Sequence, residues 1–140
     1  MLPFCTRCWA EISSRNLVCP QCGSTIDTNT SVEEQLTAAL QHPMSEARAR
    51  ICWLLGQKRA TWAIPYLLQM LDDSDLFVQV AALRALGEIG DPSVISALEN
   101  SAADDSMMIR IVAQGALEQI RARRSLQEEH TEPRTWRRHI

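Results

Sequence analysis

The sequence has no hydrophobic run that approaches the ~20 residues of a membrane-spanning helix, and its first residues show no basic region followed by an apolar core. We therefore expect no membrane span and no secretory signal, and predict a cytoplasmic protein. Positive charge is not in excess either, because the formal net charge is −3. A chain of this charge does not attract nucleic acid or anionic lipid over its whole surface.

Recognisable catalytic groups are also missing. The sequence contains no Gly-rich phosphate loop, and its three histidines, His42, His130 and His139, form no triad-like pattern with Ser, Cys or Asp. Cys52 has no cysteine, histidine or acidic neighbour close in sequence, so we interpret it as a structural thiol. We therefore predict that the protein is not an enzyme.

Four of the five cysteines form two Cys-x-x-Cys pairs, Cys5–Cys8 and Cys19–Cys22. Two residues between thiolates let one tight turn present both sulfurs to one metal, and two such turns complete a tetrahedron. We predict a Zn²⁺ bound by these four residues, with iron as the alternative for the same ligands. A Cys₄ site leaves no open coordination position, so the metal is expected to stabilise a fold rather than to catalyse a reaction.

The residues around these pairs suggest a small β structure. Short β-prone runs at 9–12, 16–18 and 25–26 flank the turns. The stretch CPQCG is typical of short zinc ribbons, which residues 3–26 resemble. That resemblance implies a structural zinc and an outer surface for contacts, carried here by Arg7, Trp9 and Arg15, although Trp9 is also a candidate for the small core.

The rest of the chain repeats with a period of 31. Leu55, Leu86 and Leu117 coincide in three copies, and each copy divides into two amphipathic helices. The predicted first helices are 32–41, 62–72 and 93–103, and the second helices are 45–57, 76–88 and 106–122. We predict a capping box at Ser31 and Glu34, and helix N-caps, rather than a Ca²⁺ loop, at Asp75 and Asp105.

The stretch LFVQVAALRALGEIGDPSVISALE resembles the HEAT-like repeats of phycobilisome lyases, and the resemblance extends over residues 32–120. It implies a mainly α fold: an α-solenoid of three helix pairs, preceded by the small β zinc ribbon, whose second helices line a concave face. The predicted organisation is a zinc ribbon at 1–27, a linker at 28–31, the solenoid at 32–124 and a basic, flexible tail at 125–140.

Partner contacts are predicted on the concave face and in the tail. Arginine, aromatic and methionine side chains, which are enriched at protein interfaces, occur at equivalent positions of the copies. These candidates are Arg48, Trp53, Phe77, Gln79, Arg84, Met108 and Arg110, and in the tail Trp136, Arg137 and Arg138.

The function predicted from this pattern is that of a non-catalytic adaptor or scaffold that binds a protein partner. One alternative is a nucleic-acid-binding accessory factor that uses the ribbon and the tail. Residues 28–120 oppose it, because they carry six Lys/Arg against twelve Asp/Glu, whereas residues 121–140 carry six Arg against three Glu. A second alternative is a bilin lyase-like subunit, prompted by the repeat resemblance.

Overall fold

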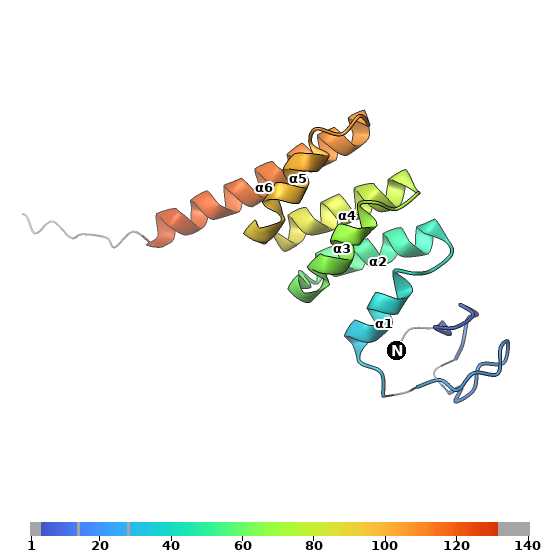
Figure 1. The fold of residues 1–140 in the computed structure, drawn as a ribbon. Coiled ribbons are helices and arrows are strands. Elements are labelled where there is room, and N and C mark those ends of the chain that lie inside the picture. Colours follow the sequence, from blue (N-terminus) through green and yellow to red (C-terminus); the bar gives the residue numbers. More distant parts are fainter. Residues whose placement is uncertain (1–3, 14, 28, 132–140) are drawn as a thin grey trace, which may run out of the picture.

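The computed structural model describes residues 4–13, 15–27 and 29–131. It contains six α-helices and two short 3₁₀ turns after a loop-rich N-terminal segment (Figure 1). The helices are α1 (Val32–Ala39), α2 (Ser45–Gln57), α3 (Ile64–Met70), α4 (Leu76–Ile89), α5 (Ile95–Ser101) and α6 (Met107–Thr131), and 3₁₀ turns at Thr61–Ala63 and Pro92–Val94 precede α3 and α5. The predicted pairs of helices are therefore present, and the array is mainly helical.

The helices form two layers. Figure 1 shows α2, α4 and α6 side by side in chain order, with the shorter α1, α3 and α5 on one side of them. Between the layers lie the leucines that recur with the period of 31: Leu55 and Leu86 are completely buried and Leu117 is nearly so. Burial of this repeated apolar stripe holds each pair against the next, because a single pair cannot cover its own stripe.

Side-chain caps begin several of these helices. The predicted capping box is confirmed, because the Ser31 hydroxyl accepts from the Glu34 N–H and Glu34 Oε2 accepts from the Ser31 N–H. The Asp75 cap is also confirmed, since its carboxylate accepts from the N–H of Phe77. The Asp105 cap is wrong: at the start of α6 it is the Ser106 hydroxyl that accepts a backbone N–H, that of Ile109.

Two glycines set the distance between the second helices. A Cβ on Gly56 would lie 2.7 Å from the Cα of Ala85, and one on Gly87 would lie 2.9 Å from the Cβ of Ala116. Such contacts are too short for carbon atoms, which prefer about 3.5–4.0 Å. The recurrence of glycine at this position in the first two copies is thus explained by close packing of α2 on α4 and of α4 on α6.

The third copy is different at these positions. Glu118 replaces the packing glycine and is exposed, and Gln114 is exposed where the earlier copies bury Cys52 and Leu83. A polar outer face is what a terminal repeat needs in order to remain in water. The outer side of α6 therefore ends the stack.

The two ends of the chain differ in part from the predicted bounds. The first part of the basic tail was expected to extend the last helix, and α6 does continue beyond 122, to Thr131, so residues 125–131 are helical. In the N-terminal segment, isolated antiparallel bridges at Phe4–Glu11 and Val18–Thr25 replace the expected strands. None of the described helices is long and apolar enough to cross a membrane.

Candidate metal centre and partner-binding surface

The two Cys-x-x-Cys pairs adopt the same local structure. In the first, the N–H of Trp9 donates to the carbonyl of Cys5, and in the second the N–H of Gly23 donates to the carbonyl of Cys19. Each first cysteine also donates its own N–H to the carbonyl five residues later, and each turn is closed by one of the two bridges. Segments 4–11 and 18–25 are therefore two equivalent turns, each carrying one Cys-x-x-Cys pair, offset by 14 residues.

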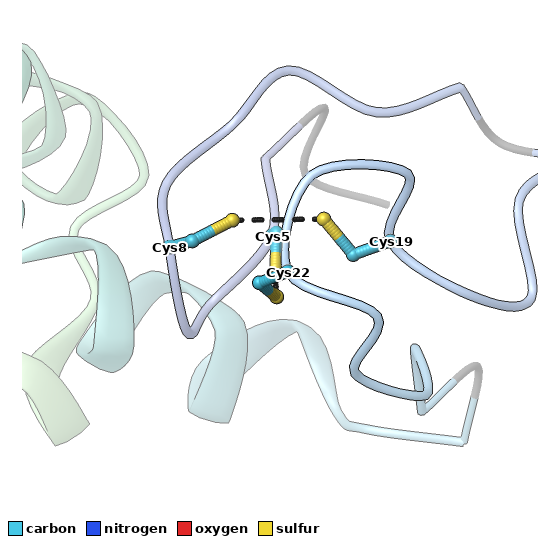
Figure 2. Close-up of side chains that lie close together, drawn as sticks. All are labelled: Cys5, Cys8, Cys19 and Cys22. Atoms are coloured by element: carbon cyan, nitrogen blue, oxygen red, sulfur yellow. Dashed lines mark hydrogen bonds between the residues drawn. The ribbon is translucent and has the colours of Figure 1, made fainter.

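These turns bring the four sulfur atoms together (Figure 2). The Sγ atoms of Cys5 and Cys22 are 3.7 Å apart, those of Cys8 and Cys19 are 3.6 Å apart, and all four lie within 4.8 Å of one another. Metal–sulfur bonds of ~2.3 Å in a tetrahedron imply sulfur–sulfur distances of about 3.8 Å. The donor set and its spacing thus fit a single tetrahedral metal ion.

The surroundings of Cys5 and Cys22 favour the thiolate form that a metal requires. By contrast, against the lowering effect of the Ala10 backbone, desolvation and the side chains of the other three cysteines raise the pKa of Cys8 to about 12. The Ser24 hydroxyl lies 3.0 Å from the Sγ of Cys22 and 3.5 Å from that of Cys5. With the backbone N–H groups of Cys8 and Arg7, Ser24 lowers the pKa of Cys5 to about 6, and it is the main cause of the lowered pKa of Cys22. Ser24 supports both turns, and its role was not predicted from the sequence.

Trp9 connects this centre to the helical array. Its ring centroid lies 4.7 Å from that of His42 in an edge-on arrangement, and the ring of Phe4 lies 5.8 Å from the same imidazole. His42, in the turn between α1 and α2, is only 6% exposed and is the one buried polar residue of the described chain. Its Nδ1 accepts from the N–H of Met44. Trp9 is therefore half-buried against the first repeat, rather than in the small core formed by Cys5, Ile12 and Cys19.

The contact continues into the second repeat through Arg48. Its guanidinium donates to the His42 carbonyl at 2.7 Å and forms a bidentate ion pair with Asp73 at 2.8 and 2.9 Å. Both side chains are largely buried, at 15% and 8% exposed. The hydrogen bond from Arg48 holds the pKa of the Asp73 carboxyl below its usual range. The N-terminal turns, the first repeat and the second are thus joined by consecutive side-chain contacts.

Three of the predicted contact residues have a role inside the fold. Arg48, Gln79 and Arg110 are equivalent by the period of 31, and each donates to the backbone carbonyls of the turn just before its own helix. These carbonyls lie five or six residues earlier in the chain in every case. The row therefore fastens three turns to three helices, and all three side chains are half-buried.

A second predicted row lines a surface groove. Trp53, Arg84 and Gly115, from α2, α4 and α6, lie in it together with Ile111 and five further residues: Gln57, Glu88, Val112, Ala116 and Gln119. Trp53 is 59% exposed and Ile111 57% exposed, which is unusual for such large apolar side chains. Gly115 contributes no side chain to the groove lining, and nothing lies within 4 Å of a Cβ built on it, so the groove has open space, here called the hollow, at this position.

Charge in this groove is unbalanced. Of its two charged residues, Glu88 accepts from the side-chain amide of Gln119 at 3.1 Å and pairs with Arg123 at 3.5 Å. Arg123 also donates to the Glu88 carbonyl at the end of α4. Arg84 is exposed and has no ion-pair partner among the described residues. The groove thus presents apolar surface together with one uncompensated positive charge.

The other predicted contact residues are dispersed. Phe77 and Met108 are exposed near the first turns of α4 and α6, and Arg7 and Arg15 are exposed on the N-terminal segment. Trp136, Arg137 and Arg138 lie outside the described residues. Cys52 is completely buried, and burial raises the pKa of its thiol to about 12, which agrees with a structural role.

Comparison with known families agrees with the helical architecture. A family of HEAT repeats matches residues 33–120, which is well over half of the chain and spans all the paired helices except the end of α6. No curated protein shows a significant match to this sequence. On the basis of the family match and the three stacked helix pairs, the chain belongs to the HEAT-repeat family.

Proposed function

We propose that the protein is a non-catalytic adaptor that binds a protein partner in the groove formed by α2, α4 and α6. The observation that carries this proposal is the exposure of Trp53 and Ile111 beside the hollow at Gly115, on the face made by the second helices. Stacked helical repeats create extended surfaces of this kind and use them for binding. Single exposed apolar side chains are common on folded surfaces, but apolar side chains that line one groove together form the kind of patch that marks interaction sites.

We propose further that Cys5, Cys8, Cys19 and Cys22 hold a structural Zn²⁺ in a zinc-ribbon-like module. The donor set supports this, because four thiolates close the coordination sphere and leave no position for water or substrate. A bound ion would supply the folding free energy that the few buried residues of this segment cannot supply. The chain's own residues shape the site: Ser24 supports the thiolates, and Trp9 fixes the module on His42.

Site-specific photo-crosslinking in lysate of the native cells tests the adaptor function. A benzophenone amino acid replaces Ile111 in the groove of the full-length, zinc-loaded chain, and the same amino acid replaces Gln69, an exposed residue of α3, as the control. We expect a discrete crosslinked protein from position 111 that is missing from position 69. Identical products from both positions, or none from position 111, would contradict the proposal.

The two alternative functions predict different binding properties. A nucleic-acid-binding factor would bind oligonucleotides with an affinity that falls steeply with salt and that depends on Arg7, Arg15 and the tail arginines. A bilin lyase-like subunit would bind a bilin or transfer it to an apo-phycobiliprotein. The adaptor is preferred because the groove lies on the helical body, where acidic residues outnumber basic ones, and its lining is mainly apolar.

A further inference from the structure

We infer that the groove formed by α2, α4 and α6 accepts a peptide segment in which a large apolar side chain is followed or preceded, two or three residues away, by an acidic one. This inference rests on the proposed adaptor function and names the chemistry of the partner. It is derived from the arrangement of Trp53, Arg84 and Gly115 across three neighbouring helices.

The apolar part of the occupant follows from the hollow on α6. Gly115 presents open space where any other residue would place a Cβ, and the exposed Ile111 and half-buried Val112 border it. A hollow with apolar walls is best filled by a leucine-sized or aromatic side chain, whose burial contributes about 25 cal/mol per Å². Water in the same place would meet few hydrogen-bonding groups.

The acidic part of the occupant follows from Arg84. The carboxylate of Glu88 is paired with Arg123 and accepts from Gln119, and no ion pair joins it to Arg84. A partner that covers Arg84 without supplying a negative charge would leave a guanidinium without counter-charge in an apolar groove, which is costly. A carboxylate on the partner removes this cost and, with Arg, can form a bidentate pair.

The spacing between the two features follows from helix geometry. Arg84 is on α4 and Gly115 is on α6, and packed helices lie about 8–10 Å apart. An extended chain advances about 3.3 Å per residue, so two or three residues separate an anchor above Gly115 from a carboxylate that reaches Arg84. Trp53, on α2, then covers the far side of the acidic residue.

The other occupants of such a groove fit less well. Residues 132–140 of the same chain carry three arginines and one glutamate, so this segment would place further positive charge against Arg84. A nucleic acid would bring a phosphate charge at every nucleotide and would meet the twelve acidic residues on the body of the array, whereas the peptide brings a single carboxylate placed at Arg84. A second copy of the chain would present a surface with the same uncompensated arginine.

Selection from a displayed library of random 12-residue peptides tests this inference. The full-length, zinc-loaded chain and its Arg84→Glu variant are used in parallel. We expect peptides with a Leu, Ile, Met or aromatic residue two or three positions from Asp or Glu to be enriched on the unmodified chain, and Lys or Arg to replace the acid on Arg84→Glu. No enrichment, neutral or basic peptides on the unmodified chain, or the same peptides on both, would overturn the inference.

Affinity measurements with one selected peptide then locate the site. Gly115→Leu fills the hollow, and we expect at least a tenfold loss of affinity, while Gln69→Leu on α3, which adds the same side chain elsewhere, changes it less than twofold. Arg84→Glu is expected to weaken binding about tenfold, since it replaces attraction by repulsion. If Gly115→Leu does not change the affinity of any selected peptide, the proposed function itself fails. If the selected peptides lack Asp and Glu and Gly115→Leu still abolishes their binding, only the acidic part of this inference fails.

Three controls test whether another molecule or segment occupies the groove instead of a partner peptide. A chain without residues 132–140 that binds the peptide more than fivefold more tightly would show that the tail occupies the groove. Dimerisation in sedimentation that Gly115→Leu abolishes would show that a second copy does. Binding of a 20-nucleotide single strand that Arg84→Glu abolishes would point to nucleic acid. Each of these results would overturn the proposal, and we expect none of them.

Discussion

Alanine substitution of the glycines on the second helices separates packing from helix propensity. Gly56→Ala places a Cβ 2.7 Å from the Cα of Ala85 and 3.0 Å from its Cβ, and neither atom belongs to a flexible side chain that can turn away. To restore a carbon–carbon distance of about 3.5–4.0 Å, α2 and α4 must separate by about 1 Å. Overpacking of this kind costs about 1–3 kcal/mol. The helix gains about 0.5–1 kcal/mol from the change of Gly to Ala, so the expected net loss is between about 0 and 2.5 kcal/mol, with its centre near 1 kcal/mol.

The matched variant is Gly115→Ala. The same substitution in α6 meets nothing within 4 Å, so only the propensity gain remains, and we expect stabilisation of about 0.5–1 kcal/mol. Thermal unfolding followed by far-UV circular dichroism in the presence of Zn²⁺ measures both. At about 4 °C per kcal/mol, the melting temperature should fall by up to about 10 °C in Gly56→Ala, with about 4–5 °C as the central value, and rise by about 2–4 °C in Gly115→Ala. A Gly56→Ala chain that is stabilised as much as Gly115→Ala would refute the packing argument.

The other predictions concern the metal centre and the contacts behind it. Removal of the metal by a strong chelator is expected to leave most of the helical circular dichroism signal. Hydrogen exchange in α1 and the following turn should increase, because Trp9 no longer packs against His42. Loss of most of the helical signal would contradict this prediction. Trp9→Gly should keep the metal, since glycine fits the backbone φ of 62° there, and yet produce the same increase in exchange. Asp73→Asn should cost about 3 kcal/mol by leaving Arg48 unpaired. The pKa of Asp73 is lower in the folded than in the unfolded chain, so its contribution to stability is complete above about pH 4 and is lost as the pH falls through the folded-state pKa. In urea titrations, Asp73→Asn should therefore lose less stability on acidification than the unmodified chain. A thiol reagent should find no reactive cysteine in the metal-bound chain, four after chelation and the fifth, the buried Cys52, only after unfolding.

The repeated part of the fold was predictable because the sequence pattern that determines each helix is local and occurs in three copies. Apolar positions at three- and four-residue steps gave the helices, and the period of 31 gave their stacking. The clustering of the four cysteines was equally predictable, because the Cys-x-x-Cys spacing fixes the geometry of each turn. The coincidence of Gly56 and Gly87 was visible too, but its cause, an approach of two helix backbones, requires the three-dimensional structure.

Contacts between distant parts of the chain were not predictable in the same way. Nothing in the residues around His42 indicates that Phe4 and Trp9 cover it, since both lie more than 30 residues before it and no repeat relates them to it. The row of Arg48, Gln79 and Arg110 was visible as a row, but whether its side chains face a partner or their own turns depends on rotamers that periodicity does not determine. One signal was available: all three residues lie five or six positions after a polar turn, the distance at which a long side chain reaches back to free carbonyls.

The two equivalent Cys-x-x-Cys turns differ at one position, and this difference explains how the N-terminal module contacts the helices. At the position after the second cysteine, both turns need a positive φ, 62° in one and 70° in the other. Gly23 occupies this position in the second turn at little cost, whereas Trp9 occupies it in the first, where a side chain costs about 1–2 kcal/mol of backbone strain. A strained tryptophan is retained only where its contacts offset that cost, and the contact seen is the edge-on packing against His42. The first turn therefore carries a strained tryptophan that docks on His42 where the second turn carries glycine. A metal bound by the proposed ligands would thus stabilise both the small module and its contact with the first repeat.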